Sequence, residues 1–359
     1  MSWETAERVA TWLGEGRPLG AAAGARPLDE STWRSLRDDF SEATARAEEL
    51  VVEATGLRSA AGPAVAQVVD RTEWVRANVV SFRRLLEPAL TQLQTAALPE
   101  PLAGATRTVT GAQLGLVLGW MATRVLGQYD MLFAEGADSG GMVSYVGPNI
   151  VALERRHAFP PRQFRMWIAL HEVTHRCQFT GVPWLRGHFL SLVDQGLTGM
   201  STDPRRFAEA LRRAGQAVRS GRNPFEDAGM LGLVAPPEQL AVIARIQAMM
   251  SLLEGHGDVT MDRVGSDDVP DAAWFSRVLH ERRKHAGILT RLLMQLVGLE
   301  AKMRQYEQGE RFIAAVESTA GPELFARVWE GPENLPSMEE IRQPDLWVAR
   351  LGTPTVAAG

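Results

Sequence analysis

The sequence predicts a mainly α-helical fold of the α+β class, with a small edge-strand element. Three observations lead to this prediction. Apolar residues recur at helical spacing along most of the chain, and residues suited to helix ends interrupt that spacing. A single short stretch around Tyr145 is rich in β-branched residues instead. A chain of 359 residues exceeds the usual size of one core, so we expect one large or two smaller packed units.

The N-terminal part is interpreted as three helices, which cover 31–56, 66–98 with an interruption near Pro88, and 111–127. The third helix carries glycines at 111, 115 and 119, which share one face and indicate a close helix neighbour. A polar, glycine-rich loop follows at 134–141. We place a boundary there, between an N-terminal helical region (1–138) and a site-bearing region (139–359), although the two can share one core.

The site-bearing region begins with an extended segment, Met142 to Glu154, in which Pro148 favours an edge strand or a strand followed by a turn. Pro160-Pro161 opens the next helix, and Gly181 ends it. The remaining predicted helices start at Asp203-Pro204, run from Pro236 to Asp262, and cover 272–298 and 299–319.

Composition narrows the function classes. The net charge is −5 and no basic block is present, which argues against nucleic acid and against an anionic membrane surface. The most apolar stretch, 111–127, is too short and too polar to span a bilayer comfortably. Cys177 is the single cysteine, so no internal disulfide can form, and the N-terminus lacks the pattern of a secretory signal. We therefore expect a cytoplasmic protein.

The stretch HEVTHRCQF carries the clearest chemical motif. His171 and His175 are four residues apart, so a helix places both imidazoles on one face, where they can bind one metal ion. Glu172 lies about 100° further round the helix, where it can act on a water molecule as a general base. The apolar residues Phe164 and Ile168 lead into the histidines on the same face and predict that the pair points inward.

A catalytic zinc site needs a third protein ligand. His188 is the nearest later histidine and is a poor candidate, because it follows a turn. The stretch SLLEGHGDVTMD offers Glu254 as the ligand, with Asp258 one turn later as a carboxylate that could hold a ligand histidine. His256 is kept as the reserve ligand. The residues alone leave an alternative open, in which the helix ends at Gly255 and these acids are simply solvated.

Together these stretches resemble the zincin-like metallopeptidase type 2 family, a group of bacterial candidate hydrolases with one branch labelled for deazaflavin-coenzyme biosynthesis. The resemblance rests on GAQLGLVLGWMATRVLGQYD, YVGPNI, HEVTHRCQF, SLLEGHGDVTMD, GLEAKMRQYEQGERF and LPSMEEIRQPDLWVARL, which span about 110–351. It implies one zinc ion, held by His171, His175 and Glu254, with Glu172 as the base and Asp258 beside the ligands.

The expected chemistry is zinc-assisted hydrolysis of a peptide or an amide. Zinc lowers the pKa of water, Glu172 takes the proton, and Tyr306 is the nominated donor to the developing oxyanion. An extended substrate could lie along residues 142–150. A small amide substrate is one alternative, and a non-catalytic metal-binding helical scaffold or interaction protein is another. Cys177 cannot meet His175 on a helix and is predicted to be a small buried residue.

Overall fold

The computed structural model describes residues 1–15, 27–93, 100–130, 141–198, 237–284 and 299–352. Helices predominate, and three short strands within these residues form one sheet, which confirms the mainly helical α+β class. The chain divides into two compact units. One comprises Met1–Gly181 and Met261–Arg283, and the other comprises Val182–Thr260 and Lys284–Gly359.

Several predictions from the sequence lie outside the described residues. The loop at 134–141 falls almost entirely within the gap at 131–140, so the boundary at 138/139 stays a prediction. The helix expected to start at Asp203-Pro204 lies in the gap at 199–236, and residues 285–298 of the helix expected at 272–298 also lie outside the described residues.

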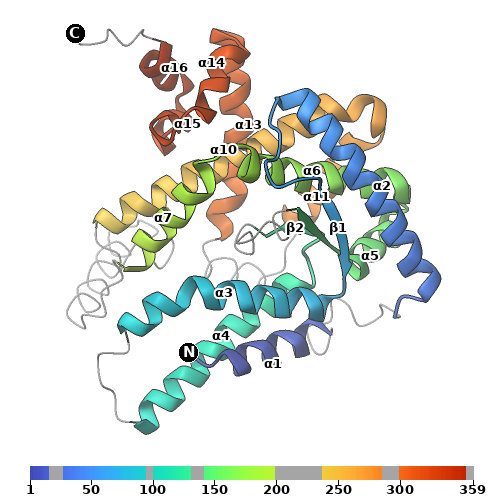
Figure 1. Cartoon of the computed structure of the whole chain (residues 1–359), viewed down its shortest axis with the longest axis vertical. Helices are drawn as coiled ribbons and strands as arrows, with labels where there is room; N and C mark the ends of the chain where they lie inside the picture. Colours follow the sequence, from blue (N-terminus) through green and yellow to red (C-terminus); the bar gives the residue numbers. More distant parts are fainter. Residues whose placement is uncertain (16–26, 94–99, 131–140, 199–236, 285–298, 353–359) are drawn as a thin grey trace. The chain divides into compact units, whose positions relative to one another are not determined.

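The first unit combines the sheet with a set of helices. The helices are α1 (Trp3–Gly14), α2 (Glu30–Thr55), α3 (Arg71–Leu93), α4 (Glu100–Ala122), α5 (Gly147–His157), α6 (Pro161–Gly181) and α11 (Ala272–Lys284), and the strands are β1 (Val65–Val69), β2 (Gly127–Tyr129) and β3 (Met142–Val146). In Figure 1, α1, α3 and α4 run side by side. Helix α2 packs against α6 and against β1.

The sheet has the order β1-β3-β2, so β3 is its central strand. Strand β1 runs parallel to β3, with Val65 opposite Met142, and β2 runs antiparallel, with Gly127 opposite Tyr145. Of the two alternatives predicted for 142–154, the edge strand is wrong, and the extended segment is also shorter than predicted. The strand is central, and it ends at Val146, where α5 begins. Pro148 lies in the first turn of α5, where a missing N–H leaves no hydrogen bond unmade.

The helix predicted at 66–98 was also wrong in its first part. Residues 65–69 form β1, because their valines pair with β3, which lies far along the chain and is invisible to local periodicity. Helix α3 then continues through Pro88 without the predicted interruption. Its start did carry a local signal, since Asp70 and Glu73 each accept a hydrogen bond of 2.7 Å from the other's backbone N–H.

Other helices agree with the prediction. Helix α2 is capped by Asp29, whose side chain accepts from the Thr32 N–H, and it ends at Gly56 with φ 71°. Helix α4 runs over 100–122 rather than 111–127, because Gly127 belongs to β2. The predicted close neighbour of its glycine stripe is α1. A Cβ atom on Gly115 would lie 2.6 Å from the Ala6 carbonyl oxygen, and one on Gly119 would lie 2.6 Å from the Leu13 Cβ.

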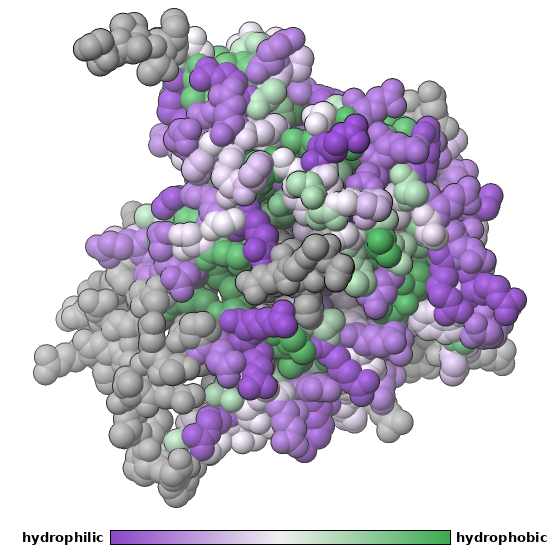
Figure 2. All heavy atoms as spheres, in the orientation of Figure 1, coloured by the Kyte–Doolittle hydropathy of each residue, from purple (hydrophilic) through white to green (hydrophobic). Residues whose placement is uncertain are grey.

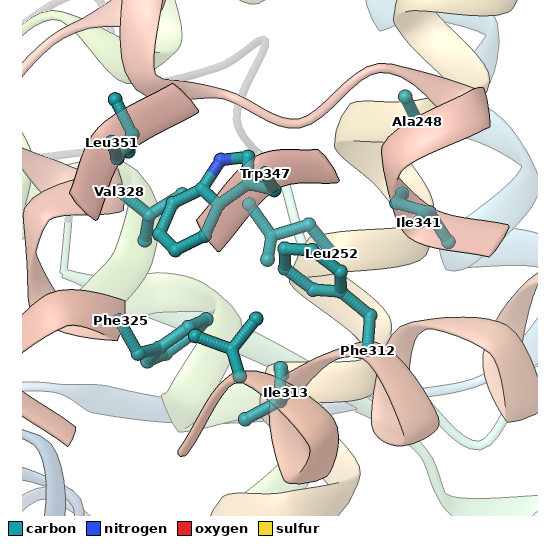
Figure 3. Close-up of a cluster of buried hydrophobic side chains, with 10 residues drawn as sticks. Ala248, Leu252, Phe312, Ile313, Phe325, Val328, Ile341, Trp347 and Leu351 are labelled. Atoms are coloured by element: carbon teal, nitrogen blue, oxygen red, sulfur yellow. The ribbon is translucent and has the colours of Figure 1, made fainter. Parts of the chain in front are cut away.

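The second unit is helical within the described residues. Its elements are α7 (Leu185–Thr198), most of α10 (Pro237–Asp268), α13 (Leu299–Ala320), α14 (Pro322–Ala326), η1 (Arg327–Trp329), η2 (Pro332–Asn334), α15 (Met338–Arg342) and α16 (Pro344–Gly352). Figure 3 shows its core, where the fully buried Trp347 from α16 lies among side chains of five other elements. The indole N–H of Trp347 donates to the Asn334 carbonyl (2.8 Å), which ties the C-terminal segment to this core.

Helices α10 and α13 cross with their backbones in contact. A Cβ atom on Gly255 would lie 2.5 Å from the Glu310 nitrogen, and one on Gly309 would overlap the Ser251 carbonyl oxygen. Gly255 therefore admits a close helix neighbour, and that neighbour is α13. The crossing fixes the part of α10 that carries Glu254, because the two backbones leave no space between them.

The described helices include none that is long and apolar enough to cross a membrane. In the view of Figure 2, hydrophilic residues cover most of the surface of these helices, and hydrophobic residues show mainly in small areas.

The backbone contact at Gly309 predicts a large and specific effect of one methyl group. Gly309→Ala forces α10 and α13 apart, and we expect a loss of about 1–3 kcal/mol in the free energy of unfolding. Gly187→Ala in α7 is the matched control, since a Cβ there meets nothing within 4 Å. It should keep or raise stability, because alanine favours a helix by about 1 kcal/mol over glycine. Equal stability of both variants in urea denaturation would contradict the close crossing.

Candidate metal centre

Helix α6 carries the two histidines of the motif. Its apolar residues Phe164 and Ile168 are buried, and His171 and His175 are half-buried on the same face. The two imidazole rings stand nearly perpendicular to each other, at 87°, with their centroids 4.6 Å apart. Their Nε2 atoms are separated by 3.3 Å, so both nitrogens converge on one point beside the helix.

This separation fits a zinc ion. Two nitrogen ligands at about 2.0–2.1 Å from a tetrahedral zinc ion lie about 3.3–3.4 Å apart. Two unprotonated nitrogens at 3.3 Å repel each other through their lone pairs unless a cation or a proton lies between them. The geometry of His171 and His175 is therefore compatible with two ligands of one metal ion, and both donors are of the type that zinc prefers.

Helix α6 is anchored on both sides of the histidines by buried arginines. Before them, Arg165 binds both carboxylate oxygens of Glu154, at 2.8 and 3.0 Å. After them, the fully buried Arg176 donates to Glu48 in α2 at 2.6 Å and to the Gly62 carbonyl at 2.5 Å. Charge-assisted hydrogen bonds of this kind fix side chains and backbone closely. The histidines thus lie on a segment that is held in place at both ends.

Glu172 is buried against the edge of the sheet. Its side chain is 9% exposed, and it occupies the space where residue 127 would otherwise carry a side chain, since a Cβ on Gly127 would lie 2.6 Å from the Glu172 Cγ. Its negative charge also acts on Tyr145 in the central strand. Burial raises the pKa of Tyr145 above its usual value, a hydrogen bond with Thr44 acts in the opposite direction, and the charge of Glu172 raises it further. The carboxylate therefore lies close to both β2 and β3.

The acids predicted as further site residues lie on α10. This helix is continuous from Pro237 to Asp268, so the alternative in which it ends at Gly255 is wrong. Glu254 is buried, with 7% of its surface exposed, and Asp258 is half-buried one turn later. His256 is 5% exposed, and its ring lies against Phe325 and Trp329, with centroids 6.1 and 5.0 Å away.

His171 and His175 lie in the first unit and Glu254 lies in the second, so the assignment of Glu254 as the third ligand stays a prediction. A comparison with known proteins shows which family the chain belongs to. The family model described as zincin-like metallopeptidase matches residues 1–348. The chain belongs to the zincin-like metallopeptidase family. This confirms the resemblance inferred from the motifs.

A solved structure supports the same class. The zincin-like chain matches the crystal structure of a candidate hydrolase with a novel fold from Chloroflexus aurantiacus, with a TM-score of 0.71 and 32% sequence identity. The match covers 98% of this chain and 99% of that one. No curated protein matches the chain. The family and the solved structure together support a metallohydrolase.

Three other residues considered from the sequence have different surroundings in the zincin-like chain. Tyr306 lies in α13, but its side chain is outside the described part of the structure. His188 in α7 packs against Trp184, which directly precedes that helix, and burial lowers the pKa of the His188 imidazole. Cys177 is fully buried, and burial raises the pKa of its thiol to about 12, which agrees with a small packing residue and not with a nucleophile.

Two residues that contact the motif were missed from the sequence. The amide oxygen of Gln178 lies 2.9 Å from Nδ1 of His175. A helical spacing of three residues was a local signal for this contact. Gly127 leaves room for the Glu172 carboxylate. The two residues are far apart in the sequence and meet only in the folded chain, so no local pattern indicated this contact.

The contact between Gly127 and Glu172 can be tested by adding one methyl group. In Gly127→Ala the new Cβ overlaps the Glu172 side chain, which is flexible and can rotate away. We therefore expect a small change in melting temperature and a displaced carboxylate in the crystal structure of the variant. An unmoved Glu172 carboxylate in that structure would show that the space beside Gly127 does not position it. Gly104→Ala in α4, where a Cβ meets nothing within 4 Å, is the control.

Proposed function

We propose that this chain is a zinc-dependent peptidase or amidase, in which His171, His175 and Glu254 hold the metal and Glu172 is the general base. The observation that carries this proposal is the 3.3 Å separation of the two Nε2 atoms, which matches that of two ligands on one tetrahedral zinc ion. Family membership supports the metal, because the matching model is that of a metallopeptidase.

Glu254 is a better third ligand than His256. Zinc binds carboxylates as well as imidazoles, and the resemblance to the family implies a glutamate at this position, so we assign the buried Glu254 as the ligand. The ring of His256 instead lies against Phe325 and Trp329, where it packs as an aromatic side chain does. Asp258 follows Glu254 by one helical turn. We assign it to hold a ligand histidine through the ring nitrogen that does not face the metal.

Glu172 is the residue that moves protons. When bound, zinc supplies Lewis acidity that polarises a substrate carbonyl and lowers the pKa of water at the site. Glu172 takes a proton from the attacking water, the water oxygen bonds to the carbonyl carbon, and the C–N bond then breaks. The proton held by Glu172 passes to the departing amine, so the carboxylate is restored. Glu172 follows His171 directly in the chain and is buried beside β2. It is therefore close to the proposed ligands without being a ligand itself.

We propose a different place for an extended substrate than the alignment along 142–150 that the sequence suggested. Strand β3 pairs with β1 on one side and with β2 on the other, and the residues from Gly147 onward are helical. Strand β2 pairs with β3 along one edge and with no second strand among the described residues. We therefore propose that an extended peptide pairs with Gly127–Tyr129, next to Glu172. A small amide would need only the place beside the metal and Glu172 where its carbonyl group reacts, and no pairing with β2.

Metal analysis of purified protein tests the ligand set. We expect about one zinc per chain in wild type and in Glu172→Gln, and loss of zinc in His171→Ala and Glu254→Ala, because a site with two remaining ligands binds weakly. The control is Glu238→Ala, which removes an exposed carboxylate near the start of the same helix α10 as Glu254. Full zinc occupancy in Glu254→Ala would remove Glu254 from the ligand set.

Hydrolysis assays test the assignment of Glu172. On a peptide library and on a panel of small amides, zinc-loaded Glu172→Gln should be slower than wild type by about 10²–10⁴, the usual contribution of a general base. Equal rates for zinc-loaded wild type and Glu172→Gln on every cleaved substrate would contradict the proposed role. Turnover of peptides alone would favour the peptidase, and turnover of small amides alone would favour the amidase.

A further inference from the structure

Gln178 contacts the ring of a proposed metal ligand. Its side chain is fully buried, one helical turn after His175 on α6, and its amide oxygen lies 2.9 Å from Nδ1 of His175. Both residues belong to the same helix, so the distance between them depends on no other element of the fold. Nε2 of the same ring faces His171. Both nitrogens of His175 are thus engaged.

The contact determines which nitrogen of His175 carries the proton. An amide oxygen has only lone pairs, so it can accept a hydrogen bond but cannot donate one. Nδ1 must therefore carry the hydrogen in the bond to Gln178. A neutral imidazole carries a single N–H, which leaves Nε2 with a bare lone pair. That is the form that a metal ion requires, and the lone pair points toward Nε2 of His171 at 3.3 Å.

The consequence differs for the two histidines. Without metal, the 3.3 Å contact is stable when His171 donates from Nε2–H to the lone pair of His175. When a metal binds, the proton on Nε2 of His171 must leave, and the neutral ring then carries its proton on Nδ1. His175 needs no change, because Gln178 already holds it in the ligand form. His175 thus has the tautomer that binds metal before metal is added, whereas His171 must change its tautomer when metal binds.

We propose that Gln178 is a positioning residue, which fixes the tautomer and the ring orientation of His175 so that Nε2 is presented to the metal. The proposal rests on the proposed metal site. The side chain of Gln178 is a neutral hydrogen-bond acceptor beside the proposed ligand His175. A carboxylate in this place would also orient the ring but would add negative charge and make His175 a more basic ligand. A neutral amide orients the ring and leaves the charge of the site unchanged.

The variants separate orientation from packing. Gln178→Met keeps the length of the side chain and removes the strong acceptor, whereas Gln178→Glu keeps an acceptor oxygen in the same place. Cys177→Ala is the matched control, because Cys177 is equally buried on the same helix and belongs to neither the site nor the bond. Zinc affinity is measured by competition with a chromogenic chelator, and folding of the zinc-free chains is measured by thermal denaturation.

We expect Gln178→Met to bind zinc about 10–100-fold more weakly than wild type, the usual effect of removing such a partner. Gln178→Glu should bind zinc at least as tightly as wild type, and Cys177→Ala should match wild type. Equal zinc affinity in wild type and in folded Gln178→Met would overturn the role of Gln178 while leaving the metal site intact. Failure of wild type itself to bind zinc would overturn the proposed function, and the role of Gln178 with it.

A measurement on wild type alone keeps the proposal testable if Gln178→Met does not fold. Long-range ¹H–¹⁵N spectra of the zinc-free chain, labelled at histidine and recorded at a pH where the rings are neutral, report which nitrogen is protonated. His175 should carry its proton on Nδ1 both before and after zinc is added. A proton on Nε2 of His175 in the zinc-free chain would overturn the proposal.

Discussion

The approach of two imidazole nitrogens to 3.3 Å is the constraint on which the candidate site depends. Two lone pairs at this distance repel, so the arrangement is stable only with a proton or a cation between them. Every neighbouring feature is consistent with the cation. Glu172 is buried beside the pair without being part of it, Gln178 holds one ring in the ligand form, and the family is that of a metallopeptidase. The fold around α6 serves to keep this approach in place.

Buried arginines keep α6 in place on both sides of the pair. Arg165 binds Glu154 before the histidines, and Arg176 binds Glu48 and the Gly62 carbonyl after them. Buried ion pairs contribute little net stability, because removing the charges from water costs about as much as their attraction returns. Their value here is geometric. Contacts on both sides of the pair hold the two histidines in one arrangement, which would favour the binding of a metal ion there.

The sequence predicted what local spacing can reveal. The helices that carry HEVTH and Glu254, the glycine stripe facing α1 and the burial of Cys177 all follow from periodicity, capping or residue type. It failed where distant segments pair. Residues 65–69 were taken for helix because their partner strand lies far along the chain, and β3 was placed at an edge because Pro148 was read as part of the strand. Gly127 was missed for the same reason, since its contact with Glu172 exists only in the folded sheet.

Anomalous diffraction at the zinc edge, from crystals soaked in zinc, tests the central claim most directly. The account predicts one strong peak at about 2.0–2.1 Å from Nε2 of both His171 and His175, with Nδ1 of His175 still bonded to Gln178. A peak bound through Nδ1 of either ring, or zinc bound only away from these two residues, would contradict the account.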